Sequence, residues 1–211
     1  MEKKKVFIFV EGVIDLRVIT SFISQNYNFQ IPHNLKGEVR IEDDNTIIDI
    51  KTLAGKGLSG CSAIERTERH EDIRDYTLKG YQCLVILDTD TPEKNAKNGG
   101  YQQRKEWLEN IIVTNSLVLD FFLLPNNHDN GDLEVLLREA LPPEQQGIIN
   151  CIEQFNICLE TYKQFPDFKQ EQNKELLYNT CYKVFGKDFK FDYTNTVFNP
   201  LREFLNAYLR T

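Results

Sequence analysis

Cys83-Leu-Val-Ile-Leu-Asp-Thr-Asp90 joins a run of apolar residues directly to two aspartates that lie one residue apart. Lys79-Gly80 precedes the run and Thr91-Pro92 follows it. A continuous apolar run of this length, with turn residues on both sides, is typical of a central strand in a parallel sheet that is covered on both faces. We therefore predict an α/β fold in which Asp88 and Asp90 stand at the carboxyl end of a buried strand.

Three other apolar runs fit the same sheet. Together they predict a four-stranded, mostly parallel sheet flanked by helices, with strands near residues 5–10, 46–53, 83–88 and 117–124. Residues 26–45 are less regular and are expected to form a connection with an edge strand. From Pro142 onward the apolar spacing is helical. We therefore divide the chain into an α/β domain at 1–140 and a helical C-terminal extension at 141–211, which should pack on the sheet domain.

The first predicted strand also ends in a carboxylate. Val10 is followed by Glu11-Gly12, and a helical stripe of apolar residues begins after them. If the first and third predicted strands are neighbours, as in a flavodoxin-like order, Glu11 and the Asp-x-Asp pair meet at the crevice where such sheets bind ligands. Gly12 is expected to adopt a backbone conformation that bulkier residues avoid. Asp15 follows one helical turn after Glu11 on the same side, either as a metal ligand or as a helix-start carboxylate favoured by the dipole.

Carboxylates this close to each other repel unless a cation lies between them. Mg2+ is a hard divalent ion that binds one or two protein carboxylates and leaves room for substrate phosphates, and Mn2+ accepts the same oxygen ligands. The alternative for the Asp-x-Asp pair is an acidic turn that only solvates a strand end. We predict a Mg2+ or Mn2+ site at Asp88 and Asp90, with the carboxylate of Glu11 beside them.

A glycine-rich loop could extend this site. Ala54-Gly-Lys-Gly-Leu-Ser-Gly60 surrounds Lys56 with glycines, and such a loop can approach a phosphate. It lacks the spacing and the ending of a Walker A motif, so a flexible turn is the alternative.

A second loop starts at the edge where Asp88 stands. Residues 126–131 follow the last predicted strand and could fold back across the edge, so we predict that Asp132 or Glu134 completes the acidic site. The alternative is that Asp132 caps the helix that starts at Leu133, a position that aspartate often takes.

Composition excludes several classes of protein. The chain has 211 residues, of which 41% are hydrophobic, and no stretch approaches the ~18 consecutive apolar residues of a membrane span. The apolar run at Val6–Val10 is too short for a signal-peptide core, so we predict a cytoplasmic protein with no membrane partner.

The five cysteines include no Cys-x-x-Cys pair, and the three histidines are scattered. The cysteines are therefore expected to be reduced thiols, mostly in the core, and zinc chemistry has little support.

The charge balance argues against tight, non-specific nucleic-acid binding. The formal net charge is −7 and there is no basic tail, whereas such affinity comes mainly from cationic contacts to phosphates. A partner protein could supply the cationic contacts that this chain lacks. The basic residues expected near the proposed edge are Arg17, Lys51, Lys56, Lys94, Lys97, Arg104 and Lys105.

Val10-Glu-Gly-Val-Ile-Asp15 and Leu87-Asp-Thr-Asp90, in this order and each after a hydrophobic strand, resemble the paired motifs of the Toprim superfamily. This superfamily is found in topoisomerases, primases, nucleases and small recombination proteins. The later stretch from Phe122 to Glu134 is similar to the closing signature of an uncharacterised, stand-alone Toprim-like family of prokaryotic proteins. The resemblance extends to about residue 140, and the helical extension after it matches no motif.

The resemblance implies roles for the acidic residues. It assigns acid–base or metal chemistry to Glu11 and Mg2+ binding to Asp88 and Asp90, and the nuclease branch adds Asp15 as a metal ligand. The chain has neither the tyrosine context of a topoisomerase nor the zinc module of a primase, so those activities are not implied.

The function predicted from these observations is Mg2+-dependent action on phosphodiester bonds, as a nuclease or nuclease subunit with DNA or RNA as substrate and an ATPase as candidate partner. One alternative is a non-catalytic, metal-dependent Toprim-like binding module. Another is a phosphatase like the haloacid dehalogenases, whose nucleophile motif also reads strand-Asp-x-Asp. Pro92 stands where that family's threonine is expected.

Overall fold

Five strands form one sheet in the order β2-β3-β1-β4-β5. In the computed structural model, which describes residues 3–31, 37–53, 60–93, 95, 98–160, 173–185 and 189–210, β1 pairs in parallel with β3 and β4, and β4 pairs in parallel with β5. β2 is antiparallel to β3. The strands are β1 (Lys4–Val10), β2 (Glu38–Glu42), β3 (Thr46–Thr52), β4 (Gln82–Asp88) and β5 (Asp120–Leu124). All four predicted strands are present and the predicted neighbours β1 and β4 are paired, but the predicted number of four strands is wrong.

The additional strand, β2, is a short edge strand. Its five residues alternate between exposed and buried, and only Val39 and Ile41 face the core. Asp43 closes the hairpin to β3, because its Oδ1 accepts the N–H of Asn45 at 2.8 Å and that of Thr46 at 2.7 Å. The edge strand that was expected within residues 26–45 is therefore present, at Glu38–Glu42.

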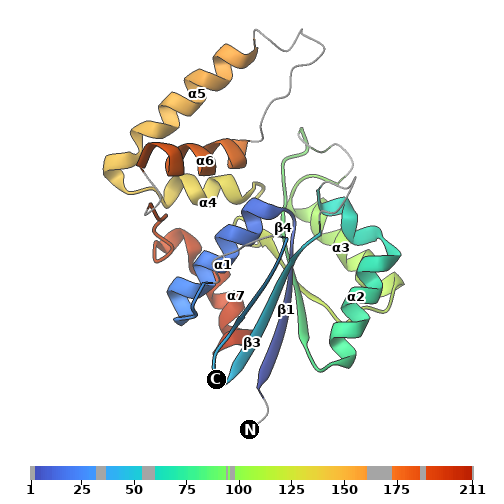
Figure 1. Ribbon diagram of the computed structural model, residues 1–211. Coiled ribbons are helices and arrows are strands. Elements are labelled where there is room, and N and C mark those ends of the chain that lie inside the picture. Colours follow the sequence, from blue (N-terminus) through green and yellow to red (C-terminus); the bar gives the residue numbers. More distant parts are fainter. Residues whose placement is uncertain are drawn as a thin grey trace.

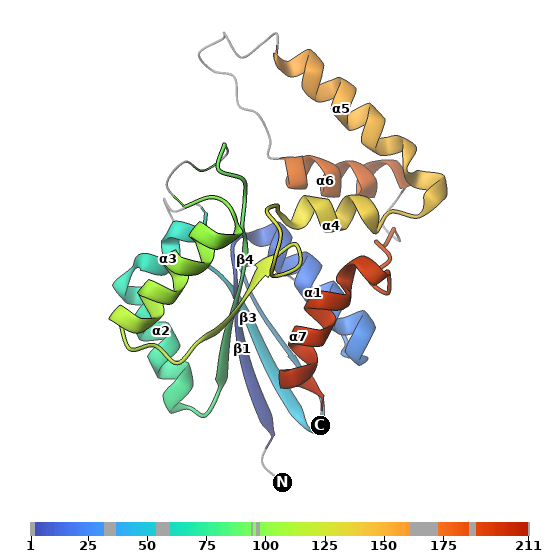
Figure 2. The same cartoon turned by 180° about the vertical axis from the view of Figure 1, so that it is seen from behind.

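Helices cover both faces of the sheet (Figures 1 and 2). The side chains of β1 alternate between the faces, so Ile8 packs into one hydrophobic cluster and Phe7 into another. The first cluster includes α1 (Val13–Tyr27) and α7 (Asn199–Leu209), and the second includes α2 (Thr67–Leu78) and α3 (Tyr101–Thr114). This double coverage explains why the parallel strands read as continuous apolar runs.

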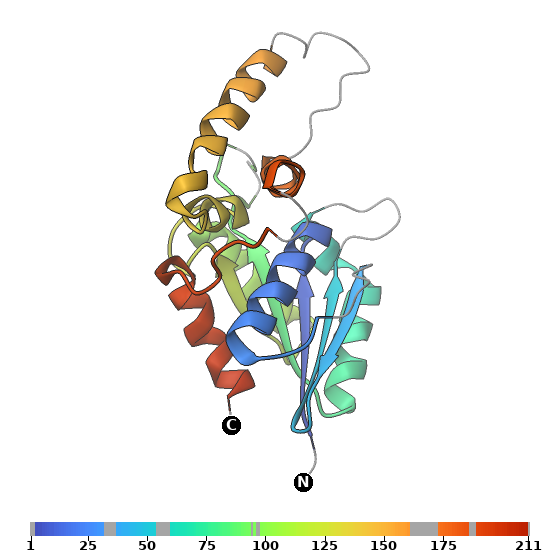
Figure 3. The ribbon, with the colours of Figure 1, turned by 60° about the vertical axis from the view of Figure 1, so that its left-hand side comes forward.

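The other helices gather beyond the carboxyl ends of the strands, and α5 stands away from the sheet (Figure 3). They are α4 (Leu133–Glu139), α5 (Gly147–Glu160) and α6 (Asn173–Phe185), with short 3-10 turns η1 (Cys61–Glu65), η2 (Pro143–Gln145) and η3 (Thr196–Phe198). None of the helices in the described ranges has both the length and the apolar character that crossing a membrane requires.

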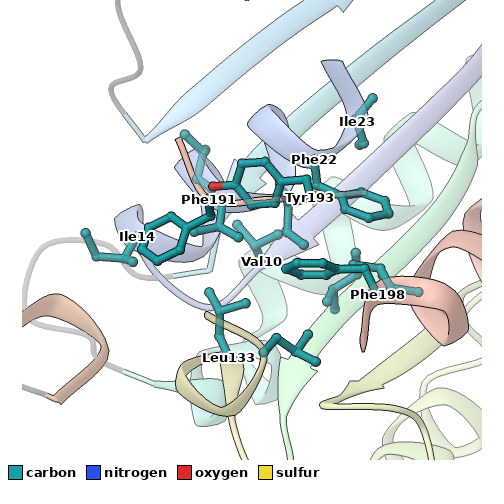
Figure 4. Close-up of a cluster of buried hydrophobic side chains, with 14 of the residues drawn as sticks. Val10, Ile14, Phe22, Ile23, Leu133, Phe191, Tyr193 and Phe198 are labelled. Atoms are coloured by element: carbon teal, nitrogen blue, oxygen red, sulfur yellow. The ribbon is translucent and has the colours of Figure 1, made fainter. Parts of the chain in front are cut away.

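The C-terminal helices share a core with the sheet. Phe191, Tyr193 and Phe198 pack among Val10 and Phe22 from the N-terminal part of the chain (Figure 4). The rings of Phe22 and Phe198 lie 5.4 Å apart between centroids. The predicted packing of the extension on the sheet domain is therefore confirmed, and the division at residue 140 stays a prediction.

Candidate functional site

The strand order creates a crevice between β1 and β4. The chain runs from β1 through α1 and β2 to β3 on one side of β1, and then crosses through α2 to β4 on the other side. The carboxyl ends of β1 and β4 therefore lie at the point where the strand order reverses, which is where open α/β sheets bind ligands. Glu11 follows the last residue of β1, Asp88 is the last residue of β4, and Asp90 lies two residues further on.

A cavity of about 290 Å3 opens at this edge. Of the predicted metal ligands, Glu11 and Asp90 line it together. They come from the ends of two adjacent strands and bring two carboxylates to one space. Among the described residues, the complete lining is Glu11, Gly60, Cys61, Ser62, Glu65, Asp90, Asn95 and Asn98.

The backbone holds Asp90 in an unusual conformation. Asp90 has a φ of 56°, in the left-handed region that few non-glycine residues adopt. Its N–H donates to the carbonyl oxygen of Gly131 at 2.7 Å. The preceding Thr89 is fully buried, and its hydroxyl accepts the N–H of Gly131 at 2.7 Å while lying 2.9 Å from the carbonyl oxygen of Leu124. The loop after β5 thus fixes the segment that carries Asp90.

A buried arginine holds the carboxylate of Asp90. Arg104 of α3 is 0% exposed, and its Nη2 donates to Asp90 Oδ2 at 2.8 Å. Its Nη1 donates to Asn98 Oδ1 at 3.2 Å and to the sulfur of Cys61. The guanidinium also lies 5.3 Å from the centroid of the Trp107 ring. Arg104 lies near the sheet edge as expected, but its side chain is enclosed within the protein and does not offer an exposed cation to a nucleic-acid backbone.

Asp88 points to a different element. It is 3% exposed, and its Oδ1 accepts the N–H of Leu133, the first residue of α4, at 2.9 Å. Asp132 occupies the cap position of α4, but its side chain makes no capping hydrogen bond there. The carboxylate of Asp88 therefore serves the start of α4 in the way that was given as the alternative role for Asp132.

Glu134 is held by its own helix. Its Oε1 accepts from Arg138 Nε at 2.7 Å, and its side chain is 9% exposed. Asp132 and Glu134 lie at the start of α4, next to the bond that Asp88 makes, whereas the cavity is lined by other described residues. The structure thus brings Glu11 to Asp90, and Asp88 to the first turn of α4.

Asp15 supports the turn that carries Glu11. It is 3% exposed, and its Oδ2 accepts the N–H of Gly12 at 2.9 Å. Gly12 has an extended backbone with a φ of −140°, so the predicted special conformation is wrong. The reason for glycine is space, because a Cβ there would lie 3.2 Å from Asp15 Oδ2.

The glycine-rich loop reaches the site at its last residue. Gly60 has a φ of 78°, which favours glycine, and a Cβ placed on it would lie 3.6 Å from Glu11 Oε1. Lys56, predicted to approach a phosphate, lies outside the described residues, as do Lys94 and Lys97.

Two other basic residues that were expected near the proposed edge make ion pairs. Lys51 Nζ is 3.0 Å from Asp72 Oδ2. Lys105 Nζ is 3.9 Å from Glu109 Oε1. Substrate binding at this edge would have to compete with these contacts.

Sequence reasoning did not assign Cys61, Asn95, Asn98 or Glu65 to the site. Cys61 and Glu65 belong to a 3-10 turn that immediately follows the glycine-rich loop, and the asparagines belong to the polar loop after Asp90. These residues follow the glycine-rich loop or Asp90 closely in the sequence, and this proximity is the signal that could have assigned them to the site.

The carboxylate and amide oxygens that line the cavity suit a hard cation that keeps part of its hydration shell. Within the described residues, no three or more His, Cys, Asp or Glu side chains are placed to hold a metal ion by themselves. Mg2+ does not need such a cage, since it is usually bound by one or two carboxylates together with waters and substrate phosphates. Glu11 and Asp90, which line one cavity, fit that pattern.

Cys61 is not suited to act as a nucleophile. Burial raises the pKa of its thiol to about 11, and the carboxylates of Glu11 and Asp90 act in the same direction against the opposing Arg104. The thiolate is the reactive form, and at pH 8 about one thiol in a thousand would carry it.

We predict that alkylation of Cys61 by iodoacetamide is slow at pH 8 and accelerates about tenfold per pH unit up to pH 10, because the thiolate fraction grows in that proportion. Mass spectrometry of the labelled peptides measures this rate, with the exposed Cys151 and Cys158 as references in the same sample. Labelling of Cys61 at neutral pH as fast as that of Cys151 would contradict the assignment.

Comparisons with known proteins give no family. No protein-family model and no curated protein matches this chain. A hypothetical protein, PH0156 from Pyrococcus horikoshii OT3, is 14% identical over 97% of this chain and 95% of its own, with a TM-score of 0.46. The cytosolic domain of the T. maritima FeoB iron transporter in its GMPPNP form is 15% identical over 97% of this chain and 96% of its own, with a TM-score of 0.23. Both TM-scores are low, and neither likeness carries an argument about this chain.

Proposed function

We propose that this chain is a Mg2+-dependent protein that acts on phosphodiester bonds of DNA or RNA, as a nuclease or as a subunit of one. The observation that supports this best is the meeting of Glu11 and Asp90, from the ends of two adjacent parallel strands, at one cavity in the sheet's crevice. The proposal agrees with the resemblance of residues 1–140 to the Toprim superfamily.

The residues of the cavity have separable roles in this proposal. Glu11 and Asp90 would hold Mg2+ or Mn2+, which when bound supplies the positive charge that polarises a phosphate and orients a water molecule. Glu11 lies at a turn on the cavity wall, where its carboxylate can also accept a proton from that water. Arg104 holds Asp90, Asp15 supports the turn of Glu11, and Asp88 anchors α4 beside the site.

A partner protein is part of this proposal. The cavity is lined by the carboxylates of Glu11, Glu65 and Asp90, and the protein as a whole carries a net charge of −7. A polyanionic substrate is repelled by such a surface unless cations offset it. We retain a cytoplasmic ATPase as the candidate partner, which would bring the nucleic acid to the site.

The test is cleavage by the purified full chain. We expect single-stranded or double-stranded DNA, or RNA, to be cut in the presence of Mg2+ or Mn2+, and cutting to stop when EDTA is added. The assay is run with the chain alone and with a candidate ATPase partner added. Metal-dependent binding of nucleic acid without cleavage would favour the non-catalytic binding module instead, and neither binding nor cleavage would overturn the proposal.

The phosphatase alternative has less support. It requires Asp88 as an exposed nucleophile, but Asp88 is 3% exposed and its Oδ1 is engaged by the N–H of Leu133. Trapping of Asp88 by beryllofluoride would restore that alternative.

A further inference from the structure

We propose that Arg104 sets the metal preference of the site, by competing with a cation for one oxygen of Asp90. The consequence is a preference for Mg2+ and Mn2+ over the larger Ca2+. This inference rests on the proposed metal-dependent function and adds a residue that determines its specificity.

The first step is that Arg104 cannot turn away from Asp90. Its side chain is 0% exposed and donates hydrogen bonds to three acceptors, Asp90 and Asn98 in the loop after β4 and Cys61 in η1. Its guanidinium also lies over the ring of Trp107. Moving it would leave a buried charge without its partners, and breaking such a pair is strongly unfavourable.

The second step is that Asp90 is equally fixed. Its backbone N–H is bonded to Gly131 at 2.7 Å, and Thr89 before it is bonded to the same loop. Arg104 is therefore held by its other acceptors and Asp90 by the hydrogen bond of its backbone, so the contact between Arg104 Nη2 and Asp90 Oδ2 is fixed on both sides. One lone pair of Oδ2 is engaged by the guanidinium, so a cation that used both oxygens of Asp90 would have to compete with this contact, whereas a cation bound through the other oxygen would not.

The third step concerns ion chemistry. Mg2+ requires near-octahedral coordination and keeps several waters, so a single oxygen from each carboxylate satisfies it. Ca2+ takes six to eight oxygens and readily uses both oxygens of a carboxylate. An aspartate with one oxygen already engaged therefore favours the smaller ion.

The test compares Mg2+ and Ca2+ dissociation constants of the full chain, measured by calorimetry, in the wild type and in Arg104→Met. We expect the preference for Mg2+ over Ca2+ to fall by about tenfold in the variant, within the range seen when residues that orient metal ligands are removed. The ratio is decisive because losing a nearby positive charge strengthens binding of both ions alike, and general loosening weakens both alike.

Two further variants complete the design. Arg69→Met removes a partly buried arginine near the same sheet end that bonds Asp72 at 2.9 Å, and should leave the ratio within about twofold of the wild type. Arg104→Lys keeps the charge but offers no planar fork, so the ratio should shift in the same direction by about threefold. If circular dichroism shows that Arg104→Met does not fold, the ratio measured in Arg104→Lys decides whether Arg104 sets the metal preference.

An unchanged ratio in the folded Arg104 variant would overturn the inference, as would a wild type that binds neither ion. The cleavage assay separates the two proposals. A wild type that prefers Mg2+, loses this preference in Arg104→Met and cleaves nothing would reject the nuclease and support Arg104. A wild type that cleaves, with an unchanged ratio in the variant, would reject only the role of Arg104.

Discussion

Replacing Glu11 with glutamine is expected to lower the rate of Mg2+-dependent cleavage by about a thousandfold, within the range that positioned acid–base groups contribute. Glutamine keeps the size of the side chain at the cavity wall but removes the charge that would bind a cation and the basicity that would accept a proton. Single-turnover cleavage of a labelled oligonucleotide at saturating Mg2+ measures the effect.

The matched control is Glu68→Gln. Glu68 is an exposed glutamate in the first turn of α2, so this change removes the same charge from the surface without touching the cavity. Its cleavage rate should stay within about twofold of the wild type, as expected for a distant surface position. A Glu11→Gln variant that cleaves as fast as the Glu68→Gln variant would remove Glu11 from the chemistry.

The two aspartates show why the site was only partly predictable. Asp88 and Asp90 were placed in one metal site because they lie one residue apart at the end of a buried strand. Residues two positions apart on a regular strand point to the same side. The strand ends at Asp88, and Asp90 adopts a left-handed conformation, so this periodicity does not continue. Asp90 turns toward Arg104 and Asp88 toward Leu133. A left-handed aspartate depends on the loop that bonds to it, from a distant part of the chain, and leaves no mark on the local pattern.

Arg104 illustrates a second limit. A charged residue in a helix with a weak apolar stripe is normally exposed. Arg104 is buried because Asp90, Asn98 and Cys61 converge on it, and this meeting depends on the tertiary fold. The buried parallel strands, in contrast, were predictable, because a strand covered on both faces must be apolar at nearly every position.

Replacing Leu205 with alanine is expected to lower the free energy of unfolding by about 3 kcal/mol, in the range of buried leucine truncations. Leu205 lies in α7, is 0% exposed and belongs to the cluster that joins α1 to the sheet. Deleting its side chain would leave a cavity in this cluster that its well-packed neighbours can fill only partly. Urea unfolding followed by circular dichroism measures the change.

Leu78→Ala is the control, because Leu78 is a leucine in helix α2 that is 85% exposed, and its truncation should change the free energy of unfolding by about 0.5 kcal/mol or less.

The comparison also tests whether α7 folds as part of the sheet domain. Tyr208 Oη donates to Asp120 Oδ2 at 2.9 Å, which ties α7 to β5 as well as to α1. If α7 is an integral layer, Leu205→Ala shifts one cooperative transition that includes the strands. A variant that instead loses only a small, separate part of the helical signal, with the main transition unmoved, would show that α7 is an appendage to a sheet that is stable without it.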